Sequence, residues 1–117
     1  MIRQFSPFTD SVVNVFGFIK GFHVKVDDLQ EDFDKYKSYK NQLSKDLIVK
    51  YIEKLKPYAL APTIAYEIFT KEPLRSNIGL YLDDDFLFPT EFLYYYKNYD
   101  IGIPPEYEEH IKKKLKG

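Results

Sequence analysis

The sequence predicts an α+β fold in a single domain, residues 1–117, that is mainly helical and carries a small antiparallel sheet or hairpin. Apolar side chains recur at helical spacing in several segments. β-branched and aromatic residues gather instead in 63–70 and 78–88, as they do in strands. With 117 residues and a hydrophobic content of 44%, the chain can bury one core but hardly two.

The N-terminal segment allows two interpretations. Thr9 and Asp10 are good N-caps, and the apolar spacing that follows them predicts a helix over 11–20. The alternating apolar positions within 18–26 favour a strand instead. A helix followed by a short strand over 22–26 would satisfy both patterns.

Two further helices are expected before the middle of the chain. Asp28 and Glu31 have the spacing of a capping box, and an apolar face continues from there to about residue 43. Ser44 is the expected N-cap of the next helix, which Pro57 ends.

The C-terminal half is expected to hold the sheet and two helices. The segment 63–70 is predicted to be a strand, and 78–88 is its expected partner. The acids at 83–85 would interrupt that second strand or form a turn within it. A helix should then cover 90–97, and Pro105 is well placed as the first residue of the last helix.

Signatures of catalysis are missing from the sequence. The five glycines are scattered and form no phosphate-binding loop. There is no cysteine, which excludes disulfides, thiol nucleophiles and zinc–thiolate sites. The two histidines, His23 and His110, lie far apart and outside any metal-ligand spacing. We therefore expect no enzymatic activity, no cofactor and no metal.

The acidic run 83–85 is the strongest candidate for chemistry. Adjacent carboxylates hold a divalent cation when carbonyls and waters complete the coordination shell. An EF-hand loop needs alternating ligands, a central glycine and a terminal glutamate, and none of these is in register here. A solvated turn is the simpler interpretation, and an acidic surface that faces a protein partner is the other.

The sequence also bears on location. Arg3 is a lone positive charge before the short apolar run 12–19, and no cleavage site follows, so no signal peptide is expected. No stretch approaches the roughly 20 apolar residues that span a bilayer. Because the net charge is −1, no overall field attracts an anionic membrane. We expect a cytoplasmic protein without membrane contact.

Two charged surfaces suggest partners. The lysine-rich helices at 35–56 are an alternative candidate for a nucleic-acid-binding or regulatory module, although a solvated helix face explains them more simply. The acidic stretches 27–34 and 83–91, with the many tyrosines, suit a protein partner instead, because carboxylates steer and orient a basic protein such as a nuclease. The residues that we nominate for contact are Asp83, Asp84, Asp85 and Glu91, followed by Asp27, Asp28, Glu31, Asp32 and Asp34.

The segment 83–107 resembles a motif of immunity proteins from bacterial polymorphic-toxin and contact-dependent growth-inhibition systems. That motif runs Asp-Gly-x-Trp-x-Trp-Pro, then x-x-Leu-x-Tyr-Tyr, then Tyr-x-Val-x-Leu-Pro-x-x-Phe. The positions that fall in register without a gap are Asp83, Phe86, Phe88, Pro89, Phe92, Tyr94, Tyr95, Tyr99, Ile101, Ile103, Pro104 and Tyr107. The chain departs from the motif at Asp84, which replaces the glycine, and at Phe86 and Phe88, which replace the two tryptophans.

The resemblance implies a specific function. Proteins of this kind are small, cytoplasmic and non-catalytic, and each binds one cognate toxin domain, often a nuclease, and blocks it. For this chain it implies a stoichiometric protein–protein complex, no direct nucleic-acid contact, and a monomer or weak dimer in the absence of toxin. The motif positions themselves are expected to be scaffold, because toxin contacts vary with the toxin.

Overall fold

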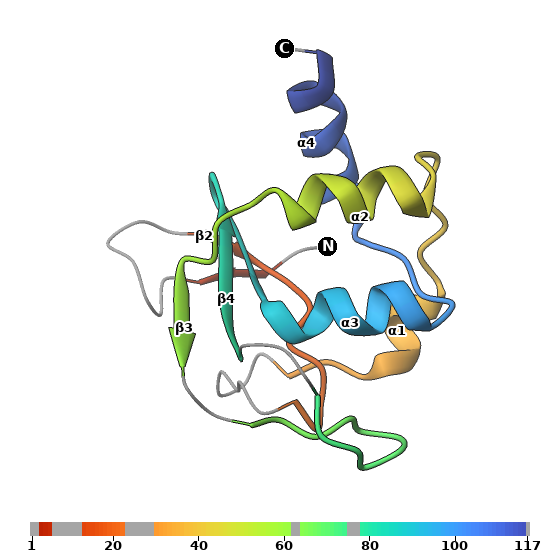
Figure 1. Ribbon diagram of the computed structural model, residues 1–117. Coiled ribbons are helices and arrows are strands. Elements are labelled where there is room, and N and C mark those ends of the chain that lie inside the picture. Colours follow the sequence, from red (N-terminus) through yellow and green to blue (C-terminus); the bar gives the residue numbers. More distant parts are fainter. Residues whose placement is uncertain (1–2, 6–12, 23–29, 62–63, 75–77, 117) are drawn as a thin grey trace.

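The computed structural model describes residues 3–5, 13–22, 30–61, 64–74 and 78–116 (Figure 1). Its elements, in chain order, are β1 (Arg3–Phe5), β2 (Val13–Val15), α1 (Phe33–Lys37), α2 (Lys45–Glu53), β3 (Ala59–Ala61), β4 (Ile78–Asp83), β5 (Phe86–Pro89), α3 (Thr90–Asn98) and α4 (Pro105–Lys116). The α+β class is confirmed, whereas a mainly helical chain is not, because five strands join the four helices in the described part. None of the described helices is long and apolar enough to cross a membrane.

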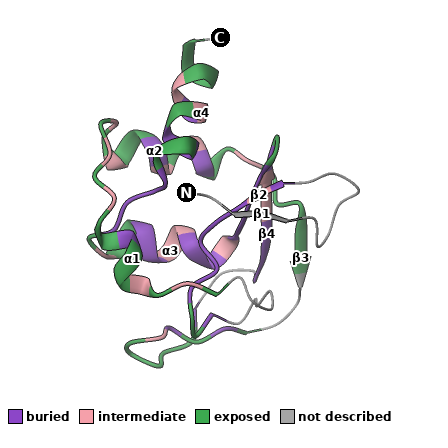
Figure 2. Cartoon of the chain, turned by 180° about the vertical axis from the view of Figure 1, so that it is seen from behind, coloured by how far each residue is buried: buried purple, intermediate pink, exposed green. Residues whose placement is uncertain are grey.

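The strands form one mixed sheet in the order β1-β2-β5-β4-β3. Three neighbouring pairs are antiparallel, but β2 and β5 run parallel, so the expectation of a purely antiparallel sheet is wrong. The helices lie to one side of the sheet in both opposite views (Figures 1 and 2). Side chains alternate along β5, so Phe86 and Phe88 face the main core while Leu87 joins a smaller cluster with Val13 and Val15.

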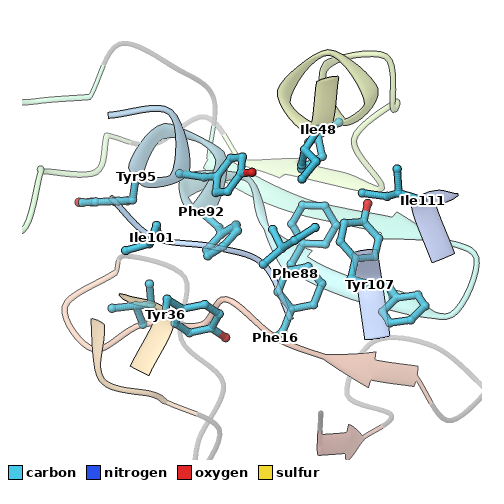
Figure 3. Close-up of a cluster of buried hydrophobic side chains, with 14 of the residues drawn as sticks. Phe16, Tyr36, Ile48, Phe88, Phe92, Tyr95, Ile101, Tyr107 and Ile111 are labelled. Atoms are coloured by element: carbon cyan, nitrogen blue, oxygen red, sulfur yellow. The ribbon is translucent and has the colours of Figure 1, made fainter. Parts of the chain in front are cut away.

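The main core is aromatic (Figure 3). The Phe88 ring stacks on Phe16 at a centroid distance of 4.8 Å and lies 5.3 Å from the ring of Tyr107. Phe92 of α3 meets Phe16 edge to face at 5.6 Å. These rings come from the loop after β2, from β5, from α3 and from α4, so the core ties the sheet to the helices.

The predicted helix over 11–20 is wrong in its described part, because Val13–Val15 is a strand. Val13 and Val15 are buried, and Asn14 between them is half-buried, which is the alternation of a strand on a sheet. Pairing with β5 overrides the helical spacing.

The predicted helix that reaches residue 43 is also much shorter, because α1 covers only Phe33–Lys37. Asp28 lies outside the described residues, and so does the proposed strand over 22–26 except for its first residue.

The middle of the chain differs as well. The predicted strand over 63–70 is wrong in its described part, where an isolated bridge joins Tyr66 to Pro73 around a turn. The partner of β4 on that side is β3, and the two strands approach closely because Gly79 has no side chain: a Cβ there would lie 1.9 Å from the carbonyl oxygen of Ala59.

The predicted starts of the remaining helices are confirmed, although α2 already ends at Glu53 and not at Pro57. Ser44 caps α2, where its hydroxyl accepts a hydrogen bond from the Leu47 amide at 3.2 Å. α3 and α4 begin at Thr90 and Pro105. The acids at 83–85 do form a turn, and it joins β4 to β5 in a hairpin.

Candidate functional site

The turn between β4 and β5 carries the three consecutive aspartates. Asp83 pairs with Phe86 in register, so Asp84 and Asp85 are the two central residues of a tight hairpin turn. Asp84 adopts a positive φ of 54°, a region that suits glycine best and that aspartate tolerates better than most residues. The side chains of Asp84 and Asp85 are exposed, so this tip is an acidic surface feature.

The two exposed aspartates have neighbours of different kinds. Asp84 accepts from the Lys114 ammonium of α4 at 2.8 Å, and this interaction holds the pKa of Asp84 below its ordinary value. Asp85 accepts from the side-chain amide of Asn14 at 3.1 Å. The turn is therefore held from α4 on one side and from β2 on the other.

Asp83 does not belong to the exposed tip, because it is buried with 6% of its surface accessible. Its Oδ2 atom accepts the hydroxyl of Tyr51 at 2.8 Å and the hydroxyl of Tyr107 at 2.9 Å. Burial, and then the nearby carboxylate of Asp83, raise the pKa of both tyrosines, so both phenols stay protonated and donate. Asp83 thus joins α2 and α4 to the end of β4.

His110 faces the same carboxylates from α4. Its Nε2 atom lies 3.3 Å from Oδ1 of Asp83 and 3.6 Å from Oδ2 of Asp84. The imidazole stacks on the ring of Tyr107 at a centroid distance of 5.8 Å and an interplanar angle of 14°. Sequence reasoning missed this histidine, because the spacing between His110 and the aspartates along the chain carries no metal-ligand signature.

The other nominated acids are scattered. Glu91 is buried in α3 with 1% of its surface accessible, and Glu31 is half-buried, where it accepts the hydroxyl of Tyr36 at 2.5 Å. Asp32 and Asp34 are exposed and form ion pairs with lysines at 3.0 and 3.1 Å. Asp27 and Asp28 lie outside the described residues.

The two acidic stretches do not form one surface. Figure 1 shows the β4–β5 turn and α1 well apart on the molecule. The burial of Asp83 and Glu91 removes both from the exposed acidic surface that the sequence suggested, because each serves the interior of the fold. Asp84 and Asp85 remain as its exposed members.

The lysine-rich helices carry local ion pairs. Three of their lysines pair with an acid one helical turn away, namely Lys35–Glu31, Lys37–Asp34 and Lys50–Asp46. Lys45 donates to the carbonyl oxygen of Tyr99 at 2.7 Å and lies 4.7 Å from the ring centre of Tyr96. These pairs reduce the positive charge that this face offers to phosphates, and they give the nucleic-acid alternative no support.

A shallow hollow of about 500 Å³ lies between α2, the sheet and α3. Leu60, Tyr81 and Leu93 contribute to its lining, and the ion pair of Lys97 with Glu53, at 3.2 Å, also lines it. Leu60 on the edge strand β3 is 52% exposed. The lining residues are dispersed along the sequence, which is why no local pattern predicted the hollow.

Comparison with known proteins supplies no relative. No family model, curated protein or solved structure matches this chain.

Proposed function

We propose that this chain is an immunity protein that binds a cognate bacterial toxin, expected to carry a nuclease domain, and neutralises it by stoichiometric association. The observation that carries the proposal is the backbone of Asp84. The immunity-protein motif has glycine at this position, and Asp84 adopts the positive φ that glycine accommodates best. The turn between β4 and β5 thus offers a counterpart to the glycine turn of the motif, with aspartate in place of glycine.

The burial of the other motif positions also supports the proposal. Phe88, Tyr95 and Ile103 have no accessible surface, and Phe86 retains only 7%. The phenylalanine rings at the two tryptophan positions, Phe86 and Phe88, both lie in the main core. This is what a scaffold motif requires, since its residues hold a surface in place without forming it.

The proposed contact surface combines acidic and aromatic side chains. Asp84 and Asp85 project from the hairpin tip, and two apolar side chains are about half exposed, Leu60 in the lining of the hollow and Tyr58 just before β3. Carboxylates would steer a basic toxin domain and fix its orientation. Exposed aromatic and aliphatic side chains would supply the apolar centre that stable protein interfaces bury.

Co-expression tests the proposal directly. In such systems the immunity gene directly follows the toxin gene, so the product of the gene immediately upstream is the candidate toxin. We expect this chain to restore growth to cells that express that product and to form a one-to-one complex with it in size-exclusion chromatography with light scattering. Continued growth arrest together with separate elution of the two proteins would overturn the proposal.

Charge reversal then locates the contact surface. Asp85→Lys should slow association with the toxin by roughly ten-fold at low salt, because steering depends on the local charge. Asp46→Lys on α2 is the matched control, since it makes the same charge change at another exposed position. Equal effects of the two variants would show that the hairpin tip is not the contact surface, while leaving toxin binding itself intact.

A further inference from the structure

We propose that Asp83, Asp84 and His110 form a binding site for one divalent transition-metal ion of the zinc type. The three side chains come from the end of β4, from the hairpin turn and from α4. One ligand atom from each lies within 4.8 Å of the other two. This inference does not depend on toxin binding, and it revises the expectation from the sequence that the chain holds no metal.

The distances suit a tetrahedral ion. The Nε2 atom of His110 lies 3.3 Å from Oδ1 of Asp83 and 3.6 Å from Oδ2 of Asp84. A tetrahedral zinc ion bound at about 2.0–2.2 Å from nitrogen and oxygen keeps its ligand atoms about 3.3–3.6 Å apart. Both distances from the histidine therefore already match, the two carboxylate oxygens lie within 4.8 Å of each other, and the fourth position would remain for a water molecule.

The histidine provides an observation that is independent of the acids. Nε2 of His110 is buried and has no hydrogen-bond partner among the described residues, because its contact with Asp83 lacks hydrogen-bond geometry. A buried polar atom without a partner is costly and uncommon. Packing against Phe86 at a centroid distance of 5.0 Å, and stacking on Tyr107, fix the ring in this position. A bound cation would satisfy the nitrogen where it already lies.

The outer hydrogen bonds of Asp83 favour the same arrangement. Tyr51 and Tyr107 both donate to Oδ2, which orients the carboxylate and directs Oδ1 to the side of His110. Hydrogen bonds behind a metal ligand of this kind orient it and raise affinity. Two carboxylates and one imidazole suit zinc, whereas calcium and magnesium require more oxygen ligands.

Lys114 acts as the competitor for the site. Its ammonium lies 2.8 Å from Oδ2 of Asp84, and its side chain is 49% exposed, so it can leave without opening the core. An ion that binds Oδ2 of Asp84 competes with this lysine. Removal of Lys114 should therefore strengthen metal binding. A purely structural cluster of charges would show no such gain.

Calorimetric titration of the metal-free chain with Zn²⁺ tests the site. We expect one ion per chain. Tyr51→Phe removes an outer hydrogen bond and should lower the affinity by roughly 10–100-fold. His110→Gln removes a ligand and should lower it by more than about 100-fold. Lys114→Met should raise the affinity by roughly ten-fold, because methionine has nearly the length of lysine but lacks its competing positive charge. Mg²⁺ and Ca²⁺ should give no comparable binding.

Two further variants keep the test decisive. Asp83→Asn retains an oxygen for both tyrosines, so it should fold normally by circular dichroism and yet lose affinity for zinc. His23→Gln is the matched control for the histidine change and should bind zinc as the parent does. A flat titration of both the parent and Lys114→Met would overturn the proposal, and so would zinc binding that survives His110→Gln or is lost in His23→Gln.

Discussion

Glu67 and Asp83 are both buried carboxylates that accept tyrosine hydroxyls, and they differ in how completely they are satisfied. Both oxygens of Glu67 are occupied: one accepts the Phe69 amide at 2.6 Å, and the other accepts the hydroxyl of Tyr99 at 2.5 Å. In Asp83 both tyrosine hydroxyls converge on one oxygen, and the other oxygen faces an imidazole nitrogen that forms no hydrogen bond within the described part of the chain. Of these two carboxylates, Asp83 is the one that retains capacity for a further ligand.

The difference separates a structural role from a binding role. Glu67 lies in the loop 64–74 and accepts donors from that loop and from the end of α3, so its hydrogen bonds close one segment onto another. Burial works to raise the pKa of Glu67, but hydrogen bonds from Tyr99, Phe69, Thr70 and Tyr94 outweigh it and hold the pKa below its ordinary value. A carboxylate stabilised in this way stays charged and fully used.

The aromatic core beneath both carboxylates sets the largest expected effect. Phe88→Ala should lower the free energy of unfolding by about 3–5 kcal/mol, because a fully buried ring is replaced by a cavity. Chemical denaturation followed by circular dichroism measures it. Leu115→Ala, at a 52% exposed position on α4, is the matched control and should change the stability little. A loss below 1 kcal/mol for Phe88→Ala would contradict the assignment of this ring to the core.

The matched pair Glu67→Gln and Asp83→Asn sharpens the comparison directly. Glu67→Gln should cost about 1–3 kcal/mol, because every donor around Glu67 already has an oxygen and the new amide group must displace one. Asp83→Asn should cost less than about 1 kcal/mol, since its amide can occupy the side that faces His110 while the remaining oxygen keeps both tyrosines. Denaturation at neutral pH measures both, and a reversed order would contradict the comparison.

Glu67 also carries an expectation in acid. Because the pKa of Glu67 is lowered in the folded chain, its contribution to stability is present above the ordinary value of 4.5 and is lost as the pH falls towards the folded value. Glu67→Gln should therefore flatten the acid limb of the stability profile. An acid limb as steep as that of the parent would place the responsible carboxylate elsewhere.

The sequence predicted best those elements whose signals are local. The Ser44 cap, the starts of α3 and α4 and the turn at the three aspartates depend on neighbouring residues, and all are confirmed. Strand β2 was missed, because its valines fit helical spacing equally well and only the distant strand β5 decides between the two. The strand predicted at 63–70 fails for the same reason, since its β-branched residues find no neighbouring strand in the described part.

The candidate site was predictable in part. The position of Asp84 and Asp85 at an exposed turn follows from three consecutive acids between apolar runs. The burial of Asp83 does not, because it depends on hydroxyls from Tyr51 and Tyr107, which lie 32 and 24 positions away in the sequence. The approach of His110 is likewise set by how α4 packs against β5, which no local pattern encodes.

The smallest expected effect concerns the hydroxyl of Tyr99. Its hydrogen bond to the Glu67 carboxylate, followed by burial, raises the pKa of Tyr99 to about 12. A phenol whose pKa is raised on folding contributes stability below its ordinary value of 10.0, and this contribution is lost as the pH rises from there to about 12.

Tyr99→Phe should therefore cost about 1 kcal/mol at neutral pH and remove one group that titrates near 12 from the phenolate absorbance. Glu67→Gln should move that same group to lower pH, because the hydrogen bond to the carboxylate is the main cause of the shift. If Tyr99→Phe instead removed a group that titrates near 10, this hydroxyl would not donate to the Glu67 carboxylate. One oxygen of Glu67 would then lack its donor, and Glu67 would no longer differ from Asp83 in having both oxygens occupied.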